Sequence, residues 1–289
     1  MAGWTLGVIG GSGLYDLDGL TDREPLRIES PFGPPSSDIV AGRIGETRLL
    51  FLPRHGPGHA IPPGAIDARA NIDALKRAGC TDLLSLSAVG SLREDIAPGT
   101  FVVVDQFIDR TVARPASFFG PGLVAHVSMA DPVCARLAGL AVAAARDAGV
   151  RVVEGGTYLA MEGPQFSTRA ESRLYRSWGC DVIGMTNLPE ARLAREAELP
   201  YASVCMVTDW DSWREGEAAV EVGDILAQLQ ANAAGARALV RRLVERLPAR
   251  RTASPVDTAL DGAVITPPGS RDPAMVARLE AVAGRVLRR

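Results

Sequence analysis

The sequence predicts a single α/β domain, and three observations support this. Short apolar runs with the length of buried strands alternate with amphipathic stretches of helical length along the whole chain. The strand-like runs tend to end in glycine-rich or polar turns, where ligands bind in α/β proteins. The 289 residues contain no internal repeat, low-complexity tract or interdomain linker. With 47% hydrophobic residues, the chain can bury a large core.

Composition also narrows the class of partner. A net charge of −3 argues against a nucleic acid or a membrane surface as the main partner. The apolar runs are too short for a transmembrane span, and we expect no secretory leader, because residues 1–4 lead into the first strand without a basic or cleavable apolar segment. The cysteines have neither CxxC nor zinc-ligand spacing, so we expect reduced thiols in a cytoplasmic protein and no metal. They are Cys80, Cys134, Cys180 and Cys205.

The first predicted strand, Leu6–Ile9, leads into a turn suited to an anion. Gly10–Gly13 follows it, and such a turn can point successive backbone N–H groups at a phosphate while Ser12 adds a hydroxyl. A dinucleotide fingerprint would require a third glycine at the position of Asp16. A dinucleotide-dependent oxidoreductase is therefore disfavoured, and a tight turn without a ligand is the alternative.

Two further turns carry groups that bind anions. Arg54 and His55 follow a strand-like run, and the planar guanidinium of arginine matches the geometry of phosphate, although such a pair is more often a surface feature. Ser87–Ser91 forms a small-residue turn after another strand. The predicted elements of this half are strands at Asp38–Ile44, Thr47–Leu52, Leu83–Leu86 and Thr100–Val104, and helices at Asp67–Gly79 and Asp131–Gly149.

The stretch from Met161 to Glu190 holds two polar passages at strand ends. In the first, Ser167 or Thr168 can cap a helix, and Glu171 lies three residues after Thr168. The second leads into a helix at Pro189, a residue that suits the first helical position. Core packing by apolar residues and ordinary turn chemistry is the alternative for either passage. The expected elements here are a strand at Tyr158–Met161, a helix at Ala170–Trp178, a strand at Asp181–Ile183 and a helix at Glu190–Glu198.

A pair of carboxylates follows the next strand, Tyr201–Val207. Asp209 and Asp211 are interleaved with tryptophans, and desolvation beside an indole raises a carboxyl pKa, so that the group can donate a proton near neutral pH. A helix-capping Asp with a solvated neighbour is the alternative. Beyond this pair we expect a long helix at Val220–Leu247 and a short amphipathic helix at Pro273–Leu287.

In their order along the chain, these motifs resemble the trimeric purine nucleoside phosphorylase family, and most of all its S-methyl-5'-thioadenosine phosphorylase branch. The resemblance extends from Leu6 to about Leu247. It rests on Gly10–Gly13, Arg54–Gly56, Ala88–Arg93, Asp105–Arg110, Glu162–Ser167, Met185–Thr186 and Thr208–Asp211.

The resemblance implies a fold in which helices flank a central, mixed and twisted β-sheet. That domain would comprise residues 1–250. Residues 251–289 would form a C-terminal extension whose short helix packs on the core or on a neighbouring subunit.

The resemblance also implies roles for individual residues. Asp209 would be the catalytic acid at the purine, and Asp211 would face the base beside it. His126 would reach the 5' end of a nucleoside in the neighbouring subunit of a homotrimer. Phosphate would be held by Ser12, Arg54, His55, Ser87, Ala88 and Thr186. Met185 would lie under the ribose, Phe166 against the purine, and Ser167, Val222 and Ile225 would tune substrate choice.

The implied reaction is phosphate-dependent cleavage of S-methyl-5'-thioadenosine to adenine and 5-methylthioribose 1-phosphate. It needs no cofactor, because inorganic phosphate is the nucleophile. Two aspartates favour a 6-aminopurine, and apolar Val222 and Ile225 favour a methylthio group over a hydroxyl.

There are two departures from the family pattern; Ser87 keeps the hydroxyl of threonine, whereas Gly184 removes a side chain near the ribose or base and leaves the 6-aminopurine assignment open. Gly184 stands where Asn is frequent and Ser87 where Thr is frequent. The alternative substrates are 5'-methylthioinosine or a 6-oxopurine nucleoside. A nucleosidase that uses water in place of phosphate is a further possibility, and so is a nucleoside sensor without catalytic activity.

Overall fold

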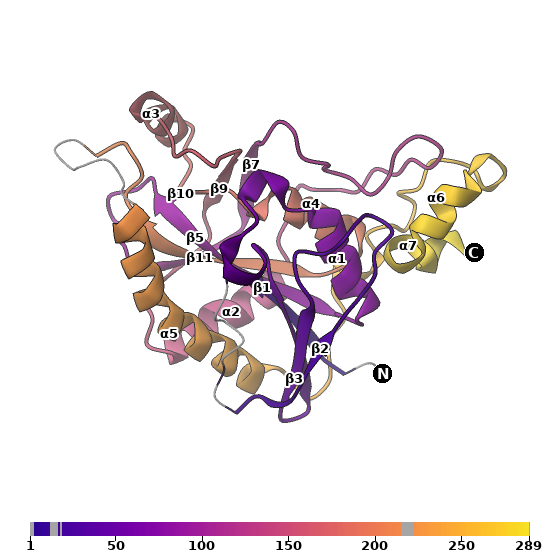
Figure 1. Cartoon of the computed structure of the whole chain (residues 1–289), viewed down its shortest axis with the longest axis horizontal. Helices are drawn as coiled ribbons and strands as arrows, with labels where there is room; N and C mark the ends of the chain where they lie inside the picture. Colours follow the sequence, from indigo (N-terminus) through magenta and orange to yellow (C-terminus); the bar gives the residue numbers. More distant parts are fainter. Residues whose placement is uncertain (1–2, 12–16, 18, 215–221, 289) are drawn as a thin grey trace.

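A mixed β-sheet runs through the centre of the chain in this computed structural model, which describes residues 3–11, 17, 19–214 and 222–288 (Figure 1). In this described part the sheet has 11 strands, and one path through it follows the order β2-β3-β4-β1-β5-β10-β9-β7. Off that path, β11 pairs with β5 and β6, and β8 pairs with β6. Parallel and antiparallel pairs both occur, so the sheet is mixed.

The strands are β1 Thr5–Gly10, β2 Thr21–Leu26, β3 Ile39–Ile44, β4 Thr47–Pro53, β5 Asp82–Ser91, β6 Phe101–Val104, β7 Gln106–Arg110, β8 Val152–Glu154, β9 Thr157–Met161, β10 Val182–Gly184 and β11 Tyr201–Asp209. The helices are α1 Ala68–Arg77, α2 Ala135–Asp147, α3 Arg169–Ser177, α4 Asn187–Glu196, α5 Val222–Arg246, α6 Pro273–Arg278 and α7 Glu280–Leu287. Short 3₁₀ turns occur at Pro57–His59, Pro63–Ala65, Pro255–Thr258 and Pro268–Ser270.

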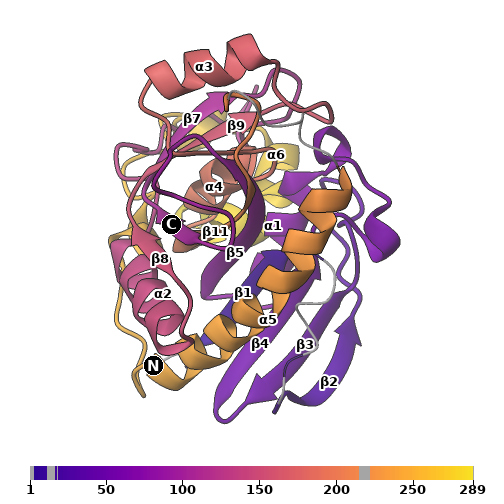
Figure 2. The same ribbon diagram turned by 90° about the vertical axis from the view of Figure 1, so that its left-hand side faces the viewer.

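Two helical layers cover the two faces of the sheet (Figures 1 and 2). On one face α1, α4 and α7 bury apolar side chains, among them Leu75 and Leu193. On the other face α2 packs against α5, with Leu137 and Leu239 in that core. The prediction of a single α/β domain with helices on a central mixed sheet is confirmed.

The strand β5 lies at the centre of the sheet and extends further than its sequence indicates. Ser87–Ser91, predicted as a turn, is part of β5, so that prediction is wrong. Its backbone continues to pair with β11, where Ser87 lies opposite Cys205, and then with β10, where Ser91 lies opposite Val182. Pairing with β11 along one side as far as Gly90, and with β10 at Gly90 and Ser91, satisfies backbone groups and outweighs the weak strand propensity of small residues.

The capping prediction for α3 is confirmed, because Thr168 and Glu171 form a reciprocal capping box. By contrast, α2 begins at Ala135 and not at Asp131, since the chain stays extended while the N–H of Cys134 bonds to the carbonyl of Tyr201. The exposed strand β2 and the short β8 have no apolar alternation and were not predicted.

The C-terminal segment packs on the core of its own chain. Leu260, Leu279 and Val282 join the same apolar cluster as α1. The predicted single helix is two, α6 and α7, which meet at Leu279. Arg285 also pairs with Glu198, which lies just after α4.

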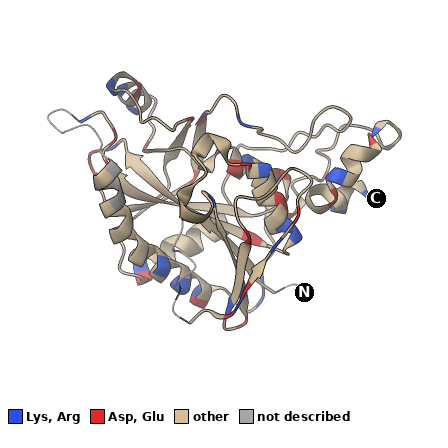
Figure 3. Cartoon of the chain, viewed as in Figure 1, with Lys and Arg blue, Asp and Glu red and all other residues tan. Residues whose placement is uncertain are grey.

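The distribution of charged residues, the cysteines and the helices agree with what the composition indicates. Acidic and basic residues are interspersed over the helices in Figure 3, in keeping with the net charge of −3. All four cysteines are free, in keeping with the expected thiols, and all four are buried. None of the described helices combines the length and apolarity that crossing a membrane would require.

Candidate active site

A cavity of about 530 Å³ opens where β4, β5, β9, β10 and β11 end. Its wall is completed by the loop after β4, by the passage after β9 and by α5. The lining residues are Gly11, Arg54, His55, His59, Ala60, Pro62, Pro63, Leu86, Ser87, Ala88, Val89, Gly90, Met161, Pro164, Phe166, Ile183, Gly184, Met185, Thr186, Met206, Thr208, Asp209, Asp211, Leu229 and Ala233.

The cavity brings together most of the residues that the sequence singled out. Those that line it are Arg54, His55, Ser87, Ala88, Phe166, Met185, Thr186, Asp209 and Asp211. They come from segments up to 157 positions apart in the chain (211 minus 54). Since parallel strands present their carboxyl ends at one edge of a sheet, motifs at strand ends meet there.

The remaining predicted residues do not line this cavity, or lie outside the described part. Ser12 lies outside the described residues, although Gly11 beside it lines the cavity. Ser167 is buried behind the wall, with its Oγ 3.7 Å from Met161 Sδ. His126 is exposed on the segment between β7 and α2, where its backbone N–H bonds to the carbonyl of Ala263. Val222 and Ile225 belong to the first turns of α5, whose side chains at these positions are not among those described.

Arg54 is almost completely buried and is paired with Glu190, a partner that sequence reasoning missed. Its Nε lies 2.8 Å from Glu190 Oε2 and its Nη2 lies 3.0 Å from Oε1, so the pair is bidentate. Further N–H groups reach Ser85 Oγ at 2.7 Å and the carbonyl of Leu86 at 3.3 Å. Burial by itself would lower the pKa of Arg54, but the charge of Glu190 raises it, so the guanidinium stays protonated.

The pairing defines how Arg54 can act. Glu190 neutralises its charge and also accepts a hydrogen bond from Tyr201 Oη at 2.9 Å. Arg54 is therefore a fixed hydrogen-bond donor at the cavity wall rather than a free positive charge. The sequence holds no local signal for this, because Glu190 lies 136 positions away in the chain.

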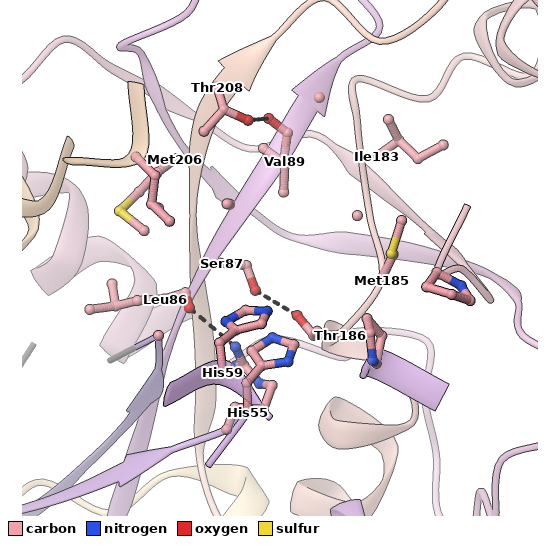
Figure 4. A pocket seen from close by; sticks show the side chains of 18 of the residues that line it. His55, His59, Leu86, Ser87, Val89, Ile183, Met185, Thr186, Met206 and Thr208 are labelled. Carbon is pink, nitrogen blue, oxygen red and sulfur yellow. Dashed lines mark hydrogen bonds between the residues drawn. The ribbon is translucent and has the colours of Figure 1, made fainter. Parts of the chain in front are cut away.

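His55 is neutral at physiological pH. Burial lowers the pKa of His55 to about 4. Its ring stacks on His59 with 4.0 Å between centroids, and its Nδ1 lies 2.9 Å from the carbonyl of Ile61 (Figure 4). The neutral ring donates Nδ1–H to that carbonyl, so Nε2 keeps a lone pair and can accept a hydrogen bond from a protonated phosphate oxygen.

Two hydroxyl groups face each other beside these imidazoles. Ser87 Oγ and Thr186 Oγ1 are 3.0 Å apart, and Figure 4 shows both next to the stacked rings. Ser87 Oγ also donates to Asn187 Oδ1 at 2.6 Å, which leaves Thr186 as the hydroxyl that is free to turn toward a ligand. Arginine, imidazole and hydroxyl groups together form a site suited to phosphate.

The other end of the cavity holds the two aspartates. Burial raises the pKa of both Asp209 and Asp211. Asp209 accepts from Thr208 Oγ1 at 2.7 Å and from the backbone N–H of Asp211 at 2.8 Å. Gly90 makes room for this arrangement, because a Cβ there would lie 2.9 Å from Asp209 Oδ1. A protonated carboxyl held in this way can donate to a leaving group.

Gly184, the departure from the family pattern, is matched to Tyr158. A Cβ at position 184 would overlap the Tyr158 hydroxyl, which is fully buried. That hydroxyl accepts the backbone N–H of Thr186 at 3.2 Å. The space that a side chain at 184 would take is therefore filled from β9, by a group that orders the phosphate-binding passage.

Comparison with known proteins identifies the family to which the chain is related. The model of the phosphorylase superfamily matches residues 5–245. The S-methyl-5'-thioadenosine phosphorylase of Cereibacter sphaeroides is 59% identical over 98% of both chains. A methylthioadenosine phosphorylase sourced from an Antarctic soil metagenomic library has a solved structure that superposes with a TM-score of 0.92, at 43% identity over 98% of this chain and 99% of that one.

A second solved structure carries a ligand. The methylthioadenosine phosphorylase of Schistosoma mansoni in complex with adenine superposes with a TM-score of 0.80, at 34% identity over 97% of this chain and 98% of that one. Together these matches confirm the resemblance drawn from the strand-end motifs, and the chain belongs to the phosphorylase superfamily.

Proposed function

We propose that this protein cleaves the N-glycosidic bond of S-methyl-5'-thioadenosine with inorganic phosphate, releasing adenine and 5-methylthioribose 1-phosphate. One observation carries the proposal. A single cavity has phosphate-type donors at Arg54 and Thr186 and a half-buried aspartate pair with raised pKa values. Relatives of nearly equal length carry the name of this activity.

The chemistry follows from these two groups. Breaking the bond leaves an electron-poor ribose and a purine that gains negative charge. Phosphate held by Arg54, His55 and Thr186 stabilises the cation and then attacks C1' of the ribose. Protonated Asp209 donates to N7 and neutralises the leaving base. No cofactor enters the reaction, since phosphate is itself the nucleophile.

The choice of substrate follows from the aspartate pair and from the apolar side chains of the cavity wall. An acid pair can donate to N7 from Asp209 and accept from a 6-amino group at Asp211. Leu229 and Ala233 of α5 give the cavity apolar surface, and Val222 and Ile225 precede them on the same helix. Such surface suits a methylthio group, although a pocket of this kind discriminates only about 10- to 200-fold against a hydroxyl.

The proposal is tested by measuring free base released from 5'-methylthioadenosine, 5'-methylthioinosine, adenosine and inosine, each with and without phosphate. We expect phosphate-dependent adenine release that is strongest with the methylthio nucleoside. Preference for the inosine forms would overturn the role given to the aspartate pair. Release without phosphate would identify a hydrolase, and no release from any nucleoside would favour a non-catalytic sensor.

We also propose that the protein is a cytoplasmic homotrimer in which His126 of one subunit reaches the nucleoside of the next. His126 is exposed and lies away from the cavity of its own chain, as a residue that serves a neighbouring site would. Four unpaired cysteines suit a reducing compartment. Sedimentation should return three times the chain mass of 30.5 kDa. A stable, active monomer would contradict the shared role of His126.

A further inference from the structure

Arg114 lies behind the cavity and has no role in the phosphate or nucleoside binding proposed so far. It belongs to the segment between β7 and α2, and only 5% of its side chain is exposed. It does not line the cavity. A guanidinium buried this deeply requires partners for its N–H groups, and those partners indicate what it does.

All five N–H donors of Arg114 have acceptors. Nη1 donates to the carbonyl of Met185 and to that of Leu188 at 3.0 Å. Nη2 donates to the carbonyls of Met161 at 3.4 Å and Glu162 at 2.5 Å. Nε donates to the Glu162 carboxylate at 3.1 Å. One side chain therefore joins four backbone carbonyls.

These carbonyls belong to two different walls of the cavity. Met161 and the residues after it follow β9 and lead to Phe166, while Met185 and Thr186 follow β10. The two passages also touch, because a Cβ at Gly163 would lie 2.5 Å from Met185 Sδ. Arg114 thus bridges the two passages on the side away from the cavity. It fixes the distance between the passage after β9, assigned to the purine, and the passage after β10, assigned to the ribose.

The segment that carries Arg114 has other anchors. Ser117 Oγ and the N–H of Phe118 each lie 2.7 Å from the Glu196 carboxylate on α4. The N–H of Val112 lies 2.7 Å from Glu162 Oε2. The bonds to Glu196 hold the segment in place without Arg114, whereas the Val112 bond adds to the link with the passage after β9. The bonds of Arg114 therefore chiefly serve the two passages.

We propose that Arg114 is a positioning residue that holds the two cavity walls at the separation required for the reaction. The proposal rests on the proposed function, because it assigns the ribose and the purine to these walls. Arg114 touches neither substrate, so its contribution is to the geometry in which phosphate, ribose and Asp209 meet. Misplacement of reacting groups by about 1 Å can cost about 100-fold in rate.

The test compares Arg114→Ala and Arg114→Lys with the wild-type protein. We expect kcat/KM for 5'-methylthioadenosine to fall about 10- to 100-fold in both variants. Lysine should not restore it, because three donors on one nitrogen cannot span acceptors on two passages. Added guanidinium ion should restore part of the activity of Arg114→Ala, and should leave Arg114→Lys unchanged because the ammonium fills the site.

Arg251→Ala is the matched control. Arg251 is 13% exposed and also holds several acceptors, including Asp82, Asp257 and the carbonyl of Thr81, but it lies outside the cavity. It should lower Tm without changing kcat/KM. Wild-type kinetics in Arg114→Ala, or an activity loss that merely parallels the loss of Tm as in Arg251→Ala, would overturn the proposal.

Calorimetric binding of 5'-methylthioadenosine separates this proposal from the proposed reaction. Weaker binding in Arg114→Ala than in wild type supports the positioning role even where turnover is absent. If the wild-type protein binds the nucleoside without cleaving it, the proposed reaction fails while the positioning role is still measured. Equal affinity in wild type and Arg114→Ala would count against the positioning role.

Discussion

Replacing Asp209 with alanine is expected to lower kcat/KM for 5'-methylthioadenosine by about 30- to 1000-fold, which corresponds to about 2–4 kcal/mol of lost transition-state stabilisation. The reason is that Asp209 is a half-buried carboxyl whose raised pKa allows it to donate to the departing purine. Steady-state kinetics with saturating phosphate measure the effect. Asp95→Ala, which removes an exposed carboxylate outside the cavity, is the matched control and should retain wild-type kinetics.

The Asp209→Asn variant separates hydrogen bonding from proton transfer. An amide can still donate to N7, but it cannot pass a proton, so this variant should lie between wild type and Asp209→Ala. A synthetic 5-methylthioriboside with a nitrophenolate leaving group needs no proton at all. If Asp209 acts as proposed, the variants should cleave that compound nearly as well as wild type does. An equal loss on both substrates would mean that Asp209 acts by shaping the cavity.

The pH dependence of the reaction follows from the same pKa. Burial favours the neutral carboxyl, so the donor form of Asp209 is present below its raised pKa and is lost as the pH rises through it. The wild-type kcat/KM should therefore decline on the alkaline side of that pKa when the phosphate dianion is held constant. Asp209→Asn should lack this decline. An alkaline limb that persists in Asp209→Asn would assign it to another group.

A structural feature of this protein can be predicted from its sequence when residues close together in the chain determine it. The fold and the chain positions of the strand-end motifs follow from short-range patterns, because apolar periodicity and glycine-rich turns are local properties. The capping box of Thr168 and Glu171 is of the same kind. The course of β5 through Ser87–Ser91 was missed because it is kept extended by pairing with β11 and, at its end, with β10, and not by its own residues.

The residues that support the cavity lining from behind could not be predicted, for a related reason. Arg54 was singled out by its residue type, but its partner Glu190 becomes its neighbour only when β4 and α4 are brought together. Likewise, Tyr158 has the pattern of an ordinary core tyrosine on β9, and its role beside Gly184 arises from the pairing of β9 with β10. Residue types predict which side chains can bind a ligand. Tertiary contacts determine which other residues hold those side chains in place.

Removing Glu190 is expected to have the largest effect on stability. In Glu190→Ala the Arg54 guanidinium stays buried without its counter-charge, and breaking such a pair costs about 3–5 kcal/mol. Urea denaturation at matched protein concentration measures this loss. Glu245→Ala is the control, because it breaks only exposed pairs with Arg241 and Arg242 on α5, and its denaturation midpoint should stay close to that of wild type.

The double variant Arg54→Met, Glu190→Leu tests whether charge, and not packing, underlies that loss. Replacing both partners with apolar side chains of similar volume removes the unpaired charge, so most of the stability lost in Glu190→Ala should return. Phosphate affinity should not return, because the donor at the cavity wall is gone; we expect KM for phosphate to rise about 10- to 100-fold, in line with a lost charge-assisted hydrogen bond of about 1.5–3 kcal/mol.

The two readouts distinguish the possible roles of the pair. Recovered stability with weakened phosphate binding means that Glu190 compensates for a charge that Arg54 needs for function. A double variant as unstable as Glu190→Ala would instead mean that the shape of these side chains matters and their charge does not. Recovery of both stability and phosphate affinity would remove Arg54 from the phosphate site, leaving Thr186 and His55 to hold the anion.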